Sequence, residues 1–127
     1  MEQFKNGVNT TNYADEAERV VDLLEKRNGK PALTTSQIRN ILARGNEIYN
    51  IVRNTGVIDE TMASQIRYLE VRLAYDSGRE RLVRDLCDKS KLNEMIKEIG
   101  NDKEKFLLFH RYLESIVAYH RFKGGND

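Results

Sequence analysis

The side chains with the most reactive chemistry in this sequence are two histidines and one cysteine. His110 and His120 lie ten residues apart, so the spacing of three or four residues that sets two metal ligands on one helix face is absent. Cys87 is the single cysteine and falls on an apolar helical stripe, where cysteine behaves as a small hydrophobic residue. These positions argue against a metal centre and a cysteine nucleophile, and they predict partly buried, hydrogen-bonded histidines.

Carboxylates gather in the first predicted helix, at Asp15, Glu16, Glu18 and Asp22. Paired carboxylates catalyse proton transfer when a cleft shifts their pKa values, but on a short amphipathic helix they more often form the solvent face. No predicted strand precedes a glycine-rich phosphate loop. We therefore predict that the protein is not an enzyme, with no catalytic residues, no metal and no cofactor.

The stretch LTTSQIRNIL, residues 33–42, offers three hydroxyl groups at the start of a helix. Thr34 with Gln37 three residues later is a capping box, in which one hydroxyl suffices. The other two, on Thr35 and Ser36, lie close to Arg39, and helix N-termini with nearby arginines bind phosphates. Redundant capping explains these two hydroxyls nearly as well.

The helix that follows presents a polar flank. At about 100° per residue, Arg39, Asn46, Asn50 and Arg53 fall on one side of the apolar stripe, whereas Arg44 falls on the other. Arg39 and Arg53 would be about 21 Å apart along the axis, enough to span several nucleotides. We predict that Arg39, Asn46 and Arg53 bind nucleic acid, with Arg79, Arg121 and Lys123 as further members of that surface.

Basic charge is concentrated around this motif. Residues 27–53 contain five basic side chains and one acidic side chain, a net of +4, whereas residues 1–26 contain three and six, a net of −3. The whole chain has a formal net charge of only +1, which argues against a histone-like protein. The local excess favours a polyanionic ligand, although a solvated basic helix face accounts for the charge equally well.

Apolar residues recur with the helical period in every patterned segment, and none alternates with a period of two. We therefore predict an all-α fold without a sheet: a compact single-domain bundle of about five helices. Residues 1–12 are expected to be a flexible lead, and residues 13–127 a single helical domain. The predicted helices begin after Asn12, at Thr34, at Asp59, near residue 81 with a break near residues 88–90, and at Asn101.

The helix expected over residues 59–77 is apolar on two sides. One stripe comprises Met62, Ile66, Leu69 and Leu73, and the other comprises Tyr68, Val71 and Tyr75. Such an element is usually central, so we place it in the middle of the core. Gly78 is the expected turn after it, and Gly29 with Pro31 is the expected end of the first helix.

Apolar runs and cysteine content indicate the cellular compartment. No apolar run approaches the about 20 residues that cross a bilayer, and the N-terminus lacks the apolar stretch of a signal peptide. A single cysteine suits a reducing compartment. These features predict a cytoplasmic protein that is not associated with a membrane.

Three stretches resemble the small subunit of type III-A CRISPR–Cas effector complexes, the Csm small-subunit family. They are LTTSQIRNIL at residues 33–42, LAYDSGRE at 73–80 and YLESIVAYHRFKGG at 112–125. Their order and spacing agree with that family from about residue 13 onward. One position departs from the pattern, because Lys123 precedes the glycine pair where an aromatic residue is expected.

The resemblance implies a helical bundle without catalytic residues. Its partners would be the guide CRISPR RNA, the target RNA, the backbone and large subunits, and further copies of itself stacked head to tail. It would line the channel for the guide–target duplex and contact the RNA backbone without reading sequence, in antiviral defence. Cleavage of the target would belong to the other subunits.

Two other functions fit the same residues. A helix-turn-helix regulator would use residues 34–53 as its recognition helix, although a DNA reader should be more basic overall. A helical protein–protein adaptor would use the arginines in ion pairs. Salt-dependent binding to single-stranded RNA without sequence preference would favour the RNA-guided complex over both.

Overall fold

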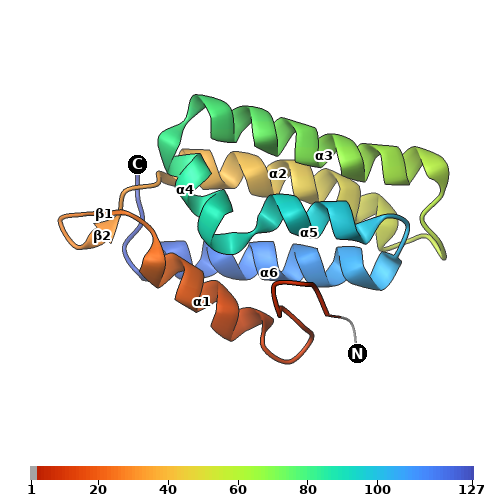
Figure 1. Cartoon of the computed structure of the whole chain (residues 1–127), viewed down its shortest axis with the longest axis horizontal. Helices are drawn as coiled ribbons and strands as arrows, with labels where there is room; N and C mark the ends of the chain where they lie inside the picture. Colours follow the sequence, from red (N-terminus) through yellow and green to blue (C-terminus); the bar gives the residue numbers. More distant parts are fainter. Residues whose placement is uncertain (1–2) are drawn as a thin grey trace.

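The computed structural model describes residues 3–127, which form a bundle of six α-helices and one two-stranded hairpin (Figure 1). The all-α prediction is therefore confirmed. No helix in this part of the chain is long and apolar enough to cross a membrane. The elements are α1 (Tyr13–Leu23), β1 (Lys26–Arg27), β2 (Lys30–Pro31), α2 (Thr35–Val52), α3 (Glu60–Arg79), α4 (Arg81–Ser90), α5 (Leu92–Ile99) and α6 (Lys103–Phe122).

The last helix, α6, is the centre of the bundle. It contacts α1, α2 and α5, and α3 lies farther out, against α2, α4 and α5 (Figure 1). Because neighbours surround α6, eight of its side chains are buried. They are Phe106, Leu108, Phe109, His110, Tyr112, Leu113, Ile116 and His120.

The prediction that the 59–77 helix is central is wrong. The Met62–Leu73 stripe of α3 is buried as expected, but Tyr68, Val71 and Tyr75 are 60%, 50% and 54% exposed. A second apolar stripe is buried only when another element covers it, and within residues 3–127 none does. Instead, the guanidinium groups of Arg72 and Arg79 each lie 5.5 Å from the centre of the Tyr75 ring.

Most helix boundaries follow from local capping. Asp59 caps α3 by accepting from the Met62 amide, and the predicted break between α4 and α5 falls at Lys91, which adopts a left-handed conformation. Two boundaries differ from the sequence prediction. Gly78 lies inside α3 rather than in a turn, and α6 is capped by Asp102, not Asn101, because the Asp102 side chain accepts from the Lys105 amide.

The predicted absence of a sheet is also wrong, in a small way. Lys26–Arg27 pairs with Lys30–Pro31 in an antiparallel hairpin. Asn28 and Gly29 join the strands with φ angles of 56° and 78°. Two consecutive positive φ angles define the type I′ turn that Asn-Gly favours in two-residue hairpins. The segment thus ends α1 and also reverses the chain before α2.

Residues 3–12 pack against the bundle, whereas the sequence predicts a flexible lead over residues 1–12. Phe4 and Val8 are each 1% exposed and belong to the core. The Asn12 side chain accepts from the Asn9 amide and donates to the Gly7 carbonyl, so it holds the lead instead of capping α1. We propose that these residues are an integral part of the helical domain.

Candidate nucleic-acid interface

The capping box at the start of α2 is present as predicted. The Thr34 hydroxyl accepts from the Gln37 amide at 3.1 Å, and the Gln37 side chain accepts from the Thr34 amide at 2.9 Å. The apolar positions that follow are buried against α3 and α6. Packing on both sides fixes α2 and therefore the direction in which its polar flank points.

The other two hydroxyls of the motif do not face an open site. A carboxylate oxygen of Asp127 accepts from both the amide and the hydroxyl of Ser36, at 3.1 and 3.0 Å. The Thr35 amide donates to the Asn126 carbonyl at 3.4 Å, and the Thr35 hydroxyl is buried without a partner. The positive end of α2 is thus satisfied by a carboxylate of the chain itself, at a place where the sequence left phosphate binding and redundant capping open.

The glycine pair before these residues is fixed rather than flexible. Gly124 has a φ of 96°, its amide donates to the Arg121 carbonyl, and the Gly125 amide donates to the His120 carbonyl at 2.8 Å. This is the Schellman arrangement, which ends a helix and reverses the chain. The His120 ring lies 2.7 Å from the Leu33 carbonyl, so the end of α6 is held beside the start of α2.

Replacing Gly125 with alanine should lower the free energy of unfolding by about 1–3 kcal/mol, the usual cost of overpacking. A Cβ atom at Gly125 would overlap the imidazole of His120, and that ring cannot move without losing its hydrogen bond to Leu33. Urea unfolding measures the loss. Gly78→Ala is the matched control, because nothing lies within 4 Å of its added carbon and alanine favours a helix. Equal stabilities of the two variants would contradict this packing.

The predicted polar flank of α2 is present, and we call its three predicted RNA-binding residues, Arg39, Asn46 and Arg53, the ledge. Arg39 and Arg53 are exposed, Asn46 is half-buried, and neither arginine forms an ion pair within residues 3–127. The Arg53 guanidinium lies 5.7 Å from the centre of the Tyr49 ring, which in turn stacks on His110 of α6 at 4.5 Å. Arg53 therefore lies on the α6 side of α2, and the helical period sets Arg39 and Asn46 on the same side.

The remaining predicted site residues are distributed over the molecule. Arg121 is exposed in the last turn of α6, at the end of the bundle where α2 begins. Arg79 ends α3 and lies over Tyr75, beyond the opposite flank of α2. The Lys123 ammonium is 3.0 Å from Glu18 and 3.3 Å from Asp22 on α1, and these hydrogen bonds raise its pKa. A phosphate at Lys123 would have to compete with two carboxylates.

His110 lies between α6 and α2, next to Tyr49 and Gly45. It is fully buried, both ring nitrogens lack a hydrogen-bond partner in the described chain, and burial lowers its pKa to about 4. The hydrogen bond predicted for this histidine is therefore absent, whereas His120 has one. Gly45 permits the close approach of α2, because a Cβ there would lie 3.3 Å from the His110 Nδ1.

Cys87 is a core residue, as predicted. It is buried, and the Ser77 hydroxyl lies 3.2 Å from its sulfur. Burial raises the pKa of the thiol to about 11, which keeps it protonated at neutral pH. A protonated, buried thiol is a poor nucleophile.

Sequence reasoning named Arg79 as a site residue but did not recognise that it belongs to one exposed set on α3, in which tyrosine and arginine alternate. Tyr68, Arg72, Tyr75 and Arg79 follow one another at intervals of four, three and four residues. These intervals set all four side chains on one helical face. An apolar stripe interrupted by arginines at helical spacing was the signal that this face is exposed.

The comparisons with known proteins identify the family. A sequence model of the family described as Csm2 Type III-A matches residues 8–126. The chain belongs to this family. The CRISPR system Cms protein Csm2 of Streptococcus thermophilus is 43% identical over 117 residues, which cover 91% of this chain and 94% of that relative. The Mycobacterium tuberculosis protein of the same name is 31% identical with the same coverage.

A third relative, the Csm2 protein of Enterococcus italicus, is 36% identical over 94 residues, or 71% of this chain and 67% of the relative. The resemblance to a type III-A Csm small subunit that the three motifs indicated is thereby confirmed. The matched range contains the whole of α2 and the Schellman turn after α6.

Proposed function

We propose that the protein is the non-catalytic small subunit of a type III-A CRISPR RNA-guided effector complex that lines the guide–target RNA channel. Membership of the Csm2 family supports the assignment to such a complex. The main support for RNA binding is the α2 ledge, where Arg39 and Arg53 are exposed and form no ion pair within residues 3–127. Guanidinium groups that form no ion pair are suited to bind phosphates.

Contacts of this kind position RNA without reading its sequence. Phosphate contacts carry no base information, and a guided complex assigns sequence recognition to base pairing. Arg39, Asn46 and Arg53 are the central members of the proposed surface, and Arg121 extends it at the start of α2. Arg79 and Lys123 are proposed as peripheral members, since Arg79 lies on α3 and not on the α2 ledge, and Lys123 is already paired with Glu18.

The reactive side chains support a non-catalytic role. His110 is buried and neutral, Cys87 is protonated, and the carboxylates of Glu18 and Asp22 are paired with Lys123. Each of these groups serves packing or ion pairing. We therefore propose that catalysis in the complex resides in other subunits, with this protein acting in the cytoplasm as part of antiviral defence.

Exposed apolar side chains at both ends of the bundle support the proposed contacts with other Csm subunits and with stacked copies. Phe122 is 78% exposed at the end of α6. Val57 is 75% exposed in the α2–α3 loop, which the Lys103 side chain ties to the start of α6. Since α6 separates the two by about 30 Å, the patches suit head-to-tail association.

Binding to RNA at several salt concentrations tests the ledge. The variant Arg39→Ala/Arg53→Ala should bind two unrelated single-stranded RNAs more weakly by the same factor. Each lost phosphate contact should reduce the salt slope by about 0.7, or about 1.4 for both. Fluorescence anisotropy with labelled RNA measures affinity and slope. Arg19→Ala is the matched control, because Arg19 is exposed on α1 and pairs with Glu16.

An unchanged affinity and slope in the double variant would show that the ledge is only a solvated helix face. Preference for one duplex DNA sequence would instead support the helix-turn-helix alternative. Assembly with protein partners but no nucleic-acid binding at any salt concentration would support the adaptor alternative.

A further inference from the structure

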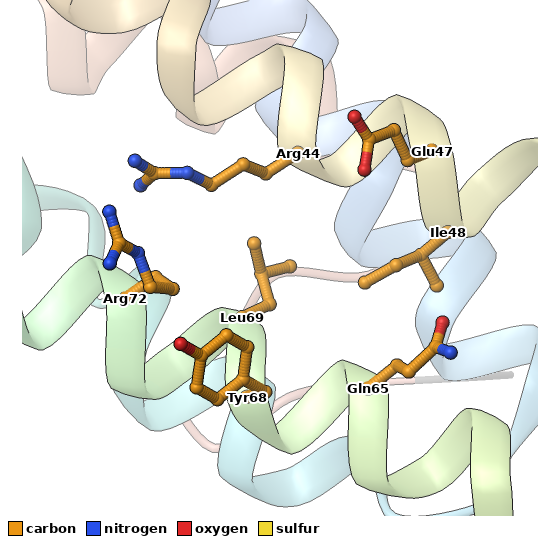
Figure 2. A pocket seen from close by; sticks show the side chains of 7 residues that line it. All are labelled: Arg44, Glu47, Ile48, Gln65, Tyr68, Leu69 and Arg72. Atoms are coloured by element: carbon orange, nitrogen blue, oxygen red, sulfur yellow. The ribbon is translucent and has the colours of Figure 1, made fainter.

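A groove separates α2 from α3 on the flank of α2 opposite the ledge. Its volume is about 590 Å³, within the range of about 300–1,000 Å³ for ligand pockets. Figure 2 shows the side chains that line it, which come from both helices. They are Arg44, Glu47 and Ile48 from α2, and Gln65, Tyr68, Leu69 and Arg72 from α3.

The lining is divided by chemistry. The guanidinium groups of Arg44 and Arg72 lie near one another at one end, and Leu69 lies in the middle (Figure 2). The ring of Tyr68 stands beside Leu69. The Gln65 amide lies at the other end, as does the Glu47 carboxylate, away from the two guanidinium groups. The groove thus has a cationic end, an apolar floor with an aromatic wall, and a hydrogen-bonding end.

The cations at this groove retain donors for a ligand. Arg44 donates one N–H to Asp76 at 2.6 Å, which leaves four of the five donors of a guanidinium. Arg72 lies over Tyr75 and forms no ion pair within residues 3–127. Two guanidinium groups side by side fit the oxygens of a phosphodiester.

The face of α3 around the groove has little exposed negative charge. Between residues 61 and 79 the only carboxylates are Glu70 and Asp76, with side chains 10% and 16% exposed. Arg67 lies 3.8 Å from Glu70, and Arg44 pairs with Asp76. Aromatic rings and guanidinium planes are exposed there, and both stack on nucleobases. The exposed carboxylate that lines the groove, Glu47 of α2, lies away from the two guanidinium groups.

We infer that the α2–α3 groove holds one unpaired nucleotide of a single-stranded RNA, with its base stacked on Tyr68 and its phosphate at Arg44 and Arg72. This inference rests on the proposed RNA-binding function and adds a base-stacking site to it, separate from the phosphate-binding ledge. RNA is favoured over an acidic protein segment because a nucleotide supplies both a negative charge for the cationic end and a planar apolar face for the aromatic wall.

Removing the stacking ring tests this site. Tyr68→Ala should weaken binding of a labelled, non-self-complementary single-stranded RNA about tenfold, and should leave binding of the same RNA annealed as a duplex unchanged. Val71→Ala is the matched control, since Val71 is 50% exposed on α3 but does not line the groove. Tyr68 is 60% exposed, so its variant should keep the melting temperature of the parent.

An abasic strand separates stacking from charge. The parent protein should lose about tenfold in affinity when bases are replaced by abasic sugars, and Tyr68→Ala should bind intact and abasic strands alike. Thiouridine-containing RNA should crosslink to Tyr68. The ledge variant Arg39→Ala/Arg53→Ala should still show the tenfold difference between intact and abasic strands, so failure of the ledge and failure of the groove are distinguishable.

Several outcomes would overturn the inference. Unchanged single-strand affinity in Tyr68→Ala, with loss of incorporation into the protein complex, would assign the groove to a protein partner. Equal affinity for adenosine monophosphate and for the strand would assign it to a free nucleotide. Loss of affinity for duplex and single strand alike would make Tyr68 a general backbone contact.

Discussion

Replacing Phe4 with alanine should lower the free energy of unfolding by about 3–5 kcal/mol, as is usual for a buried phenylalanine. Phe4 is 1% exposed although it lies near the start of the chain. Its amide bonds to the Val8 carbonyl, and the adjacent Lys5 amide bonds to Glu98 at 3.0 Å. A cavity at this position cannot close without moving those hydrogen-bonded segments. Denaturant unfolding followed by circular dichroism measures the change.

The chain offers a matched control for this substitution. Phe122 is 78% exposed, so Phe122→Ala should change stability by less than about 0.5 kcal/mol. If both phenylalanine variants unfold at the same denaturant concentration as the parent, the first ten or so residues are not part of the folded domain. The flexible lead predicted from the sequence would then be correct.

Acid should destabilise the protein through His110. A histidine in the unfolded chain has a pKa of about 6.5, whereas burial lowers the pKa of His110 to about 4 in the folded protein. Between these values the unfolded state binds more protons, so stability falls as the pH falls. The His110 contribution should be complete above pH about 6.5, reduced by about 2 kcal/mol at pH about 5, and reduced by about 3 kcal/mol near pH 4.

Unfolding free energies at pH about 7 and about 5, above the range in which most carboxylates titrate, measure this effect. His110→Phe, which preserves an aromatic ring between Tyr49 and Phe106, should remove about 2 kcal/mol of the pH dependence. The same slope in parent and variant would show that the pKa of His110 is the same in the folded and the unfolded state. An NMR titration of the His110 ring gives the pKa directly and does not depend on the stability of the variant.

Local signals in the sequence predicted much of the fold because they act over a few residues. The Thr34–Gln37 capping box and the apolar stripe of α2 needed only the helical period. The break between α4 and α5 was visible as an interruption of that period, and the structure places it at Lys91. The ledge of Arg39, Asn46 and Arg53 followed from the same period, so its geometry could be predicted.

Features that depend on distant partners could not be predicted in this way. Whether Tyr68 and Tyr75 are covered depends on which helices pack against α3, and an apolar stripe in the sequence does not indicate which helices these are. The contact of Asp127 with Ser36 joins residues 91 positions apart, so no local pattern indicated that a carboxylate occupies the start of α2. The hairpin could have been predicted locally, because Asn28–Gly29 is a recognised turn signal. It was missed because its two-residue strands are too short to show an alternating pattern.

The central position of α6 has a consequence for synthesis. Ribosomes add about 5–20 residues per second, so several seconds separate the emergence of α1 from that of α6. During this time Ala17, Val20 and Val21 of α1 lack the helix against which they pack in the bundle. Until α6 emerges, α3 can already pack against α2, α4 and α5, but the apolar faces of α1, α2 and α5 that contact α6 stay uncovered. The bundle should therefore be completed only when α6 docks, and the uncovered apolar faces should make the chain a substrate for chaperones beforehand.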